Sequence, residues 1–211
     1  QAIAQQVRSG GRRVPLVLAS STQAEQRNLY GQSKLAAEQA VKSLASDTGN
    51  PCVIFRLPGV FGKWCRPNYN SVVATFCHNI ARGLPIQVND PGTSLELVYV
   101  DDVVSTLMKT VEACMSDVAN AVDYSDAKRG HVCPSYSTSL GELAEQIQAF
   151  GNSRTTLMSE HVGVGLVRAL YATYVSYLPN ERFTYEVPQY EDPRGVFVEM
   201  LKTHDSGQFS Y

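Results

Sequence analysis

Residues 20–34, with the sequence SSTQAEQRNLYGQSK, join an apolar run to a helical pattern. The apolar run Val14–Ala19 is typical of a buried strand, and Leu35–Leu44 repeats apolar side chains at helical spacing. A pair of serines therefore leaves the end of a strand, and Tyr30 and Lys34 enter the helix that follows. Residues four apart lie on one face of a helix, so we expect these two side chains to act together.

The Tyr30 and Lys34 pair suits a phenol that is used as an acid or a base. An ammonium group held beside a phenol stabilises the phenolate and so assists proton transfer. Ser21, at the strand end, could share a proton with the phenol or orient a substrate carbonyl. Ligands bind at the carboxyl ends of strands in open α/β sheets, which favours a site here. A tyrosine and a lysine also fall four apart on many helices without catalytic roles, so the spacing alone leaves a structural role open.

The next segments predict an α/β fold with a Rossmann-like parallel sheet. Turn residues at Asp47–Pro51 close the helix, and a second apolar run follows at Cys52–Leu57. Strand, helix and strand with short links indicate a βαβ unit. Ser139 and Glu142 form a capping box before another helix. Further helices are expected at Val72–Arg82, from Asp101 onward, at Leu140–Phe150 and at His161–Leu178, and strands at Ile86–Val88, Leu95–Val100, His131–Cys133, Val196–Lys202 and Gln208–Tyr211.

The composition excludes several specialised classes of protein. The 211 residues are 44% hydrophobic and carry a formal net charge of −2, so no nucleic-acid partner is indicated. Five scattered cysteines and four histidines lack metal-ligand spacing, which predicts free thiols, no metal site and a cytoplasmic protein. No run approaches the ~20 consecutive apolar residues of a membrane span, so no membrane partner is expected.

Ser20-Ser21 followed by Tyr30-Gly31-Gln32-Ser33-Lys34 resembles the catalytic signature of the extended short-chain dehydrogenase/reductase superfamily. That superfamily contains nucleotide-sugar epimerases, dehydratases and reductases that use NAD or NADP. The resemblance implies that Ser21, Tyr30 and Lys34 form a catalytic triad. It also implies that Tyr30 and Lys34 contact the nicotinamide cofactor.

Two other segments carry the same resemblance. The strand end Leu57-Pro58 is similar to the family segment that passes the nicotinamide, which implies cofactor contacts for Leu57 and Pro58. The position after this proline is usually asparagine in relatives and is Gly59 here. Tyr99–Val103 resembles a second family segment, although the arginine that usually precedes it and clamps substrate phosphates is Leu95 here.

The loop Lys63–Asn70, KWCRPNYN, combines cationic, aromatic and amide side chains. Such a loop can hold a diphosphate and stack a uracil ring, because arginine makes bidentate contacts with phosphate. We therefore expect Lys63, Arg66 and Asn70 to bind substrate. The alternative is a solvated loop with its tryptophan packed beneath it.

Three features narrow the resemblance to bifunctional bacterial reductase–cupin enzymes of capsular polysaccharide synthesis. They are the short gap between the serines and Tyr30, the loop Lys63–Asn70 and the segment Asp192–Gln208. The resemblance implies that residues 1–180 are the C-terminal part of a reductase domain whose N-terminal βαβ unit is missing. It implies that residues 181–211 are a linker and the first strands of a β-rich cupin domain.

The function implied by this resemblance is reduction of a 4-keto UDP-deoxysugar, with NADPH favoured over NADH, in a homodimer. Zinc is implied only for the part of the cupin that lies beyond this chain. An epimerase or dehydratase of the same fold is the main alternative, although Thr22-Gln23 stands where a dehydratase usually has an acidic pair. A non-catalytic binding domain is the alternative from another class, and the intact Ser21, Tyr30 and Lys34 argue against it.

Overall fold

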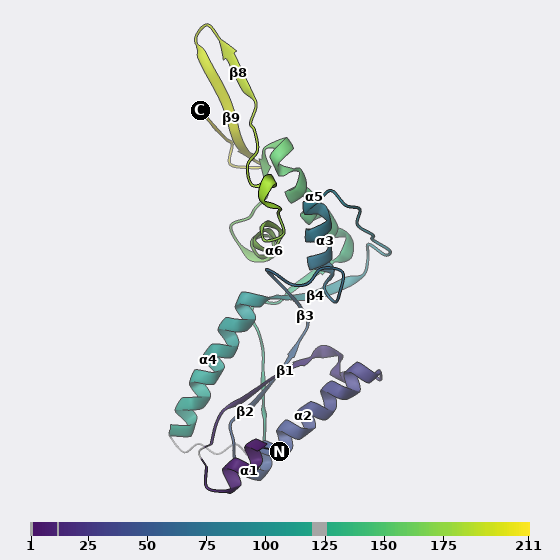
Figure 1. The fold of residues 1–211 in the computed structure, drawn as a ribbon, viewed down its shortest axis with the longest axis vertical. Helices are drawn as coiled ribbons and strands as arrows, with labels where there is room; N and C mark the ends of the chain where they lie inside the picture. Colours follow the sequence, from purple (N-terminus) through teal and green to yellow (C-terminus); the bar gives the residue numbers. More distant parts are fainter. Residues whose placement is uncertain (1, 12, 120–125) are drawn as a thin grey trace. The chain divides into compact units, whose positions relative to one another are not determined.

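A computed structural model describes residues 2–11, 13–119 and 126–211 of the chain (Figure 1). These residues form two compact units. Unit 1 consists of Gln1–Val60 and Val98–Ser135, and unit 2 of Phe61–Leu97 and Tyr136–Tyr211. The domain boundary predicted after residue 180 therefore lies inside unit 2.

Unit 1 is built on a three-stranded parallel sheet with the strand order β1-β2-β5. Its elements are α1 (Ala2–Arg8), β1 (Leu16–Ser21), the 3₁₀ helix η1 (Thr22–Glu25), α2 (Leu29–Thr48), β2 (Cys52–Leu57), α4 (Val100–Ala119) and β5 (Lys128–Gly130). Helices α2 and α4 flank this sheet on opposite sides in Figure 1. The predicted parallel sheet and the predicted βαβ unit, β1-α2-β2, are confirmed.

Strand β2 is the centre of the core of unit 1, because its side chains alternate between the two faces of the sheet. One face packs against α4 in a cluster of Val53, Phe55, Leu57, Val98, Val103, Cys114 and Val132. The other face packs against α2 in a cluster of Val41, Ala45, Cys52, Ile54 and Ala127. Both clusters exclude water from β2, which explains why the strand reads as an almost continuous apolar run.

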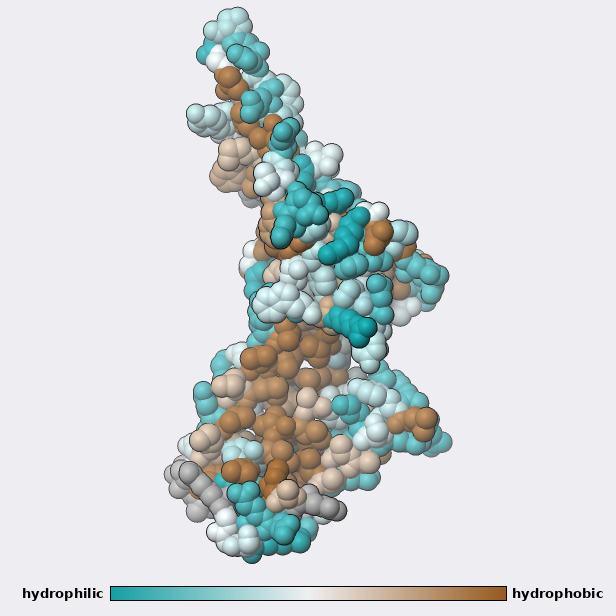
Figure 2. Space-filling view, in the orientation of Figure 1, coloured by the Kyte–Doolittle hydropathy of each residue, from teal (hydrophilic) through white to brown (hydrophobic). Residues whose placement is uncertain are grey.

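The outer side of α4 is apolar and open. Val104, Met108 and Met115 of this helix are more than half exposed. Figure 2 shows hydrophobic side chains gathered on the face of unit 1 beside α4. Among the described residues, nothing covers this part of the helix.

Unit 2 combines a helical core with short strands. Its helices are α3 (Val72–Ala81), α5 (Leu140–Thr156), α6 (Gly165–Val175) and the 3₁₀ helix η2 (Asn180–Arg182). Helices α3, α5 and α6 pack on one another and bury Phe76, Leu143, Ile147, Phe150 and Leu170. Helix α5 begins with the predicted capping box, in which Ser139 Oγ accepts a hydrogen bond from the Glu142 amide at 3.2 Å.

Two further sheets contain the remaining strands. Strands β3 (Gly59–Phe61), β4 (Ser94–Tyr99) and β6 (Tyr136–Ser139) form one sheet in that order, in which β4 and β6 are antiparallel. The other has the order β10-β9-β7, with β8 paired to β9 in an antiparallel hairpin. Its strands are β7 (Met158–Ser159), β8 (Gln189–Asp192), β9 (Gly195–Thr203) and β10 (Gln208–Ser210).

Some predicted elements differ from the observed ones. Ile86–Val88 and His131–Cys133 are not strands, since neither segment is paired in a ladder in the described part of the chain. The strand expected at His131–Cys133 lies three residues earlier, as β5 against β2. Helix α6 begins at Gly165 rather than at His161, because the chain is extended at Val164 and Gly165 has a φ of +62°.

Gly130 provides a test of how tightly β5 packs on β2. A Cβ atom at Gly130, which pairs with Phe55, would lie 2.3 Å from Cζ of the Phe55 ring. We expect Gly130→Ala to lower the free energy of unfolding by about 1–3 kcal/mol, because overpacking forces side chains from their preferred rotamers. Urea titration measures this change.

The matched control is Gly163→Ala, since a Cβ atom there meets nothing within 4 Å. Its free energy of unfolding should stay within about 0.5 kcal/mol of the wild type. Equal effects of the two substitutions would contradict the packing of β5 on β2.

Candidate active site

Ser21 lies at the carboxyl end of β1, where the strand gives way to η1. Its Oγ accepts a hydrogen bond from the Gln23 amide at 3.2 Å and so caps η1. Ser21 pairs with Leu57 in the parallel register of β1 and β2. Pro58 directly follows Leu57, so three of the predicted site residues lie at one edge of the sheet.

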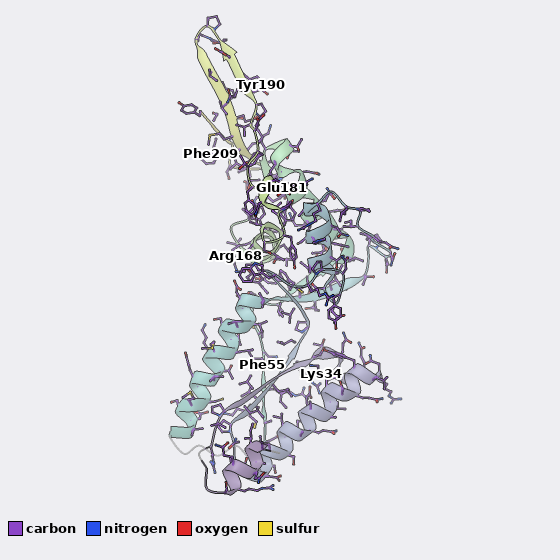
Figure 3. The ribbon with its side chains drawn as sticks, in the orientation of Figure 1. Lys34, Phe55, Arg168, Glu181, Tyr190 and Phe209 are labelled. Carbon is purple, nitrogen blue, oxygen red and sulfur yellow. The ribbon has the colours of Figure 1, made fainter. Side chains whose placement is uncertain are left out.

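Tyr30 and Lys34 lie in the first turns of α2, and Figure 3 labels Lys34 in this part of the helix. The Lys34 Nζ atom lies 5.5 Å from the centroid of the Tyr30 ring. It also donates a long hydrogen bond, 3.5 Å, to the carbonyl oxygen of Ala19 on β1. Tyr30 is 49% exposed, so a ligand could reach its ring and hydroxyl. The structure thus brings the predicted pair together beside the strand that carries Ser21.

The start of α2 packs directly on η1 through Gly31. The Asn28 side chain caps the helix by accepting a hydrogen bond from the Gly31 amide at 2.7 Å. A Cβ atom at Gly31 would lie 2.4 Å from the carbonyl oxygens of both Gln23 and Gln26. Glycine is therefore required here for the close approach of two backbones.

The Lys34 and Tyr30 donors fit the hydroxyl groups of a nicotinamide cofactor's ribose. An ammonium group has three N–H donors. In the described part of the chain, the hydrogen-bond acceptor of the Lys34 ammonium is the Ala19 carbonyl at 3.5 Å, a weak contact. Donors of the ammonium therefore remain for a ligand, and on the neighbouring strand end Leu57 is buried in the core whereas Pro58 is partly exposed.

A buried ion pair lies between α2 and β2 and was not predicted from the sequence. Arg56 donates from Nε to Glu38 Oε1 at 2.9 Å and from Nη2 to Glu38 Oε2 at 2.7 Å. Ser20 donates to Glu38 Oε1 at 2.5 Å, and Arg56 Nη1 donates to Glu25 Oε1 at 2.5 Å. Hydrogen bonding from Arg56 lowers the pKa of the Glu38 carboxyl below its usual value, against the effect of burial. No motif in the sequence marks this contact, because it joins residues on different elements.

The loop Lys63–Asn70 belongs to unit 2 and exposes its aromatic side chains. Trp64 is 83% exposed, with Lys63 Nζ 5.9 Å from its ring centroid. Tyr69 is also exposed, with Arg66 Cζ 5.7 Å from its ring centroid. The alternative in which the tryptophan packs beneath the loop is wrong. Each cation therefore accompanies an accessible aromatic face.

The backbone of this loop is held from two sides. The Tyr177 hydroxyl donates to the carbonyl oxygen of Cys65, and the Asn68 amide donates to Thr75 Oγ1 at 2.9 Å. Burial raises the pKa of Tyr177 to about 12, so this phenol remains a donor at neutral pH. Asn70 lines a cavity of about 610 Å³, together with Asn68, Tyr69, Ser71, Val72, Thr75, Phe76, Asn79, Pro85, Ile86 and Gln87.

The described residues offer neither a metal site nor a membrane-spanning helix. No group of three or more histidine, cysteine, aspartate or glutamate side chains there could hold a metal ion. No helix in the described ranges is long and apolar enough to cross a membrane.

Comparison with protein families and known proteins gives consistent matches. The model of the "NAD dependent epimerase/dehydratase family" matches residues 11–122. The UDP-2-acetamido-2,6-beta-L-arabino-hexul-4-ose reductase of Pseudomonas aeruginosa is 56% identical over 210 residues, which are 100% of this chain and 54% of that protein. The crystal structure of the capsular polysaccharide assembling protein CapF from Staphylococcus aureus is 40% identical, with a TM-score of 0.79 over 93% of this chain and 51% of that one. The chain thus spans about half the length of these two relatives.

A more distant structure shows the fold alone. The UDP-glucose 4-epimerase of Thermus thermophilus, in complex with NAD, is 17% identical, with a TM-score of 0.57. The match covers 83% of this chain and 67% of that one.

Gly31 provides a test of the contact between α2 and η1. Replacing glycine by alanine inside a helix normally stabilises it by roughly 0.5–1 kcal/mol. We expect Gly31→Ala to lower the free energy of unfolding instead, by about 1–3 kcal/mol, because its Cβ would press on two carbonyl oxygens. Urea titration measures the change.

Gln39→Ala is the control, since Gln39 is an exposed residue of the same helix. It should change stability by less than about 0.5 kcal/mol. A stabilising effect of Gly31→Ala would rule out the close backbone contact.

Proposed function

Because this chain belongs to the NAD dependent epimerase/dehydratase family, we propose that it catalyses the NAD(P)H-dependent reduction of a 4-keto UDP-deoxysugar in surface polysaccharide biosynthesis. The observation that carries the proposal is the Lys34 ammonium held over the Tyr30 ring, beside the strand end that bears Ser21. The name of the Pseudomonas aeruginosa relative, a UDP-hexul-4-ose reductase, supports the choice of reduction.

The proposed reaction converts the C4 ketone of the sugar into an alcohol. The reduced cofactor, when bound, supplies the hydride for C4. Tyr30 donates its hydroxyl proton to the ketone oxygen, and Lys34 stabilises the phenolate that remains. The proton balance closes when solvent returns a proton to the exposed Tyr30.

Ser21 is suited to bind the ketone oxygen. Its Oγ already accepts a hydrogen bond from the Gln23 amide, which fixes the position of the oxygen atom. A serine hydroxyl has one donor besides its acceptor lone pairs. The Ser21 hydroxyl hydrogen is therefore free to point to the substrate, where it polarises the carbonyl together with Tyr30.

The cofactor is proposed to lie against Leu57 and Pro58. Lys34 would donate to its ribose hydroxyls, since the ammonium contacts only Ala19 and the Tyr30 ring among the described residues. The family is named for its dependence on NAD. We propose NADPH as the reductant that the protein prefers.

The substrate is proposed to bind through Lys63, Arg66 and Asn70. Arg66 and Lys63 supply positive charge for a diphosphate, and arginine binds phosphate oxygens in a bidentate manner. Asn70 opens into the cavity of about 610 Å³, a volume within the range of small-molecule sites. The exposed Trp64 offers a face on which a uracil ring can stack.

The proposal extends to the longer protein that the relatives represent. The antiparallel strands β8, β9 and β10 are consistent with the start of a cupin domain after residue 180. We propose that zinc binds only in the rest of that domain, and that the protein is a cytoplasmic homodimer.

The assay that tests the function follows the absorbance of reduced nicotinamide with a 4-keto UDP-deoxysugar and the full-length protein. A reductase consumes one equivalent of NAD(P)H per sugar, whereas an epimerase regenerates its cofactor and shows no net consumption. We expect Tyr30→Phe and Lys34→Ala each to lower kcat by about 10²–10⁴-fold, as is usual when a general acid is removed.

Matched controls are Tyr190→Phe and Lys42→Ala, which alter an exposed tyrosine of β8 and an exposed lysine of α2. Both should keep wild-type rates. Near-normal turnover in Tyr30→Phe would show that Tyr30 is not the proton donor. Absence of net NAD(P)H consumption by the wild type would favour an epimerase or a binding domain.

Arg66 provides a test of the substrate loop. We expect Arg66→Ala to raise KM for the UDP-sugar about tenfold with kcat unchanged, because a phosphate contact acts equally in the ground state and the transition state. Initial rates at varied sugar concentration measure this effect. Arg194→Ala, in the β8–β9 turn, is the control, because the Arg194 side chain is 90% exposed. An unchanged KM in Arg66→Ala would remove Arg66 from the site.

A further inference from the structure

We propose that the buried contact of Glu38 with Arg56, together with Ser20 and Glu25, positions Tyr30 and Lys34 against Ser21 for proton transfer. We call these four residues the ion-pair brace. The inference rests on the proposed function, and it assigns no contact with substrate or cofactor to the brace. Glu38 and Arg56 are positioning residues that act through α2 and β2.

The ion-pair brace joins four elements of unit 1, three of which carry residues of the candidate site. Ser20 is on β1, Glu25 on η1, Glu38 on α2 and Arg56 on β2. Three of the four are close in sequence to a residue of the site: Ser20 precedes Ser21, Glu38 follows Lys34 by one helical turn, and Arg56 precedes Leu57. A shift of any one element would therefore break a hydrogen bond of the brace.

The geometry of the brace fixes the rotation of α2 about its axis. Glu38 is four residues after Lys34 and eight after Tyr30, so the three side chains lie near one helix face. Two parallel hydrogen bonds from a planar guanidinium restrict the carboxylate in direction as well as in distance. The rotation that satisfies Arg56 therefore also turns Lys34 and Tyr30 toward the end of β1, where Lys34 meets the Ala19 carbonyl.

The packing of α2 on β2 does not by itself explain why Glu38 and Arg56 carry buried charges there. The Glu38 side chain is 3% exposed and that of Arg56 is 17% exposed. Arg56 is the one charged residue of β2, whose other side chains are apolar. Replacing a buried ion pair by apolar residues often leaves stability unchanged or raises it, so stability alone does not explain why the pair is present. We infer that the pair of Glu38 and Arg56 serves to fix one relative position of α2 and β2.

The surroundings of Glu38 agree with a carboxylate that stays charged. The charged and polar groups that act on it are Arg56 from β2, Ser20 from β1 and, at longer range, Arg129 from β5. Glu25 takes the remaining end of the Arg56 guanidinium and is 74% exposed. The buried carboxylate of Glu38 thus receives four hydrogen bonds, three from Arg56 and one from Ser20, while the exposed carboxylate of Glu25 receives one from Arg56.

The test compares single-turnover rates in the full-length protein. Enzyme saturated with NADPH is mixed in excess with the 4-keto UDP-sugar, and the loss of reduced nicotinamide is followed in time. The rate constant reached at high enzyme concentration does not depend on the fraction of folded enzyme. A merely structural role would therefore change the amount of enzyme needed and leave that rate constant unaltered.

We expect Glu38→Gln to lower this rate constant about 10–100-fold, the usual cost of misplacing catalytic groups by about 1 Å. Arg56→Lys keeps the charge but cannot span both carboxylates, and it should lower the rate constant several-fold. It serves as the second variant if Glu38→Gln does not fold. Rate constants within twofold of the wild type in the variants that fold would overturn the proposal.

Asp47→Asn is the matched control. It removes the carboxylate of another ion pair of α2, with Arg8 at 3.2 Å, but both partners are exposed and lie at the far end of the helix. Its single-turnover rate constant should equal that of the wild type. An equal loss of rate in Asp47→Asn would show a general effect of α2 and would also overturn the proposal.

Amide hydrogen exchange separates failure of the brace from failure of the proposed function. Residues 29–34 should exchange faster in Glu38→Gln than in Asp47→Asn, and this measurement needs no substrate. If the wild type does not oxidise NADPH in the presence of the sugar, the proposed reductase activity is wrong. If amide exchange of residues 29–34 is unchanged in Glu38→Gln, the proposed role of the ion-pair brace is wrong, whatever the activity.

Discussion

The parallel register of β1 and β2 is the constraint on which the candidate site depends. Because Ser21 pairs with Leu57, both strands end at the same level and release their next residues at one edge of the sheet. Helix α2, which connects the two strands, must start beside that edge to return along the sheet. The first turn of the connection is therefore the part of unit 1 best placed to supply groups to a ligand there, and it carries Tyr30 and Lys34.

Local periodicity was sufficient to predict this arrangement, but not the contacts that hold it. The apolar runs of β1 and β2 and the helical pattern of α2 defined the βαβ unit, since each depends on neighbouring residues. Glu38 and Arg56 could not be paired from the sequence, because each is a common surface residue and only the fold brings them together. The role of Gly31 was missed for the same reason, as its contacts lie on η1.

The errors in unit 2 have a related cause. Ile86–Val88 has the apolar composition of a strand but no partner strand among the described residues, so the chain remains irregular there and lines the cavity beside Asn70. β3 and β8 are too short or too polar to show alternation, and they exist because β4 and β9 offer open edges. Short strands are defined by their partners rather than by their own residues.

Two kinds of contact set the distance and the angle of α2. The backbone contact at Gly31 sets how closely the helix start approaches η1, and it acts through repulsion at short range. The hydrogen bonds of Glu38 set the rotation of the helix about its axis, because a paired guanidinium and carboxylate must face each other in one orientation. Neither alone determines where the Tyr30 hydroxyl lies, because a helix at the right distance can still turn about its axis. A tyrosine that is half exposed, as Tyr30 is, has few contacts of its own, so its position is set from the buried side of the helix.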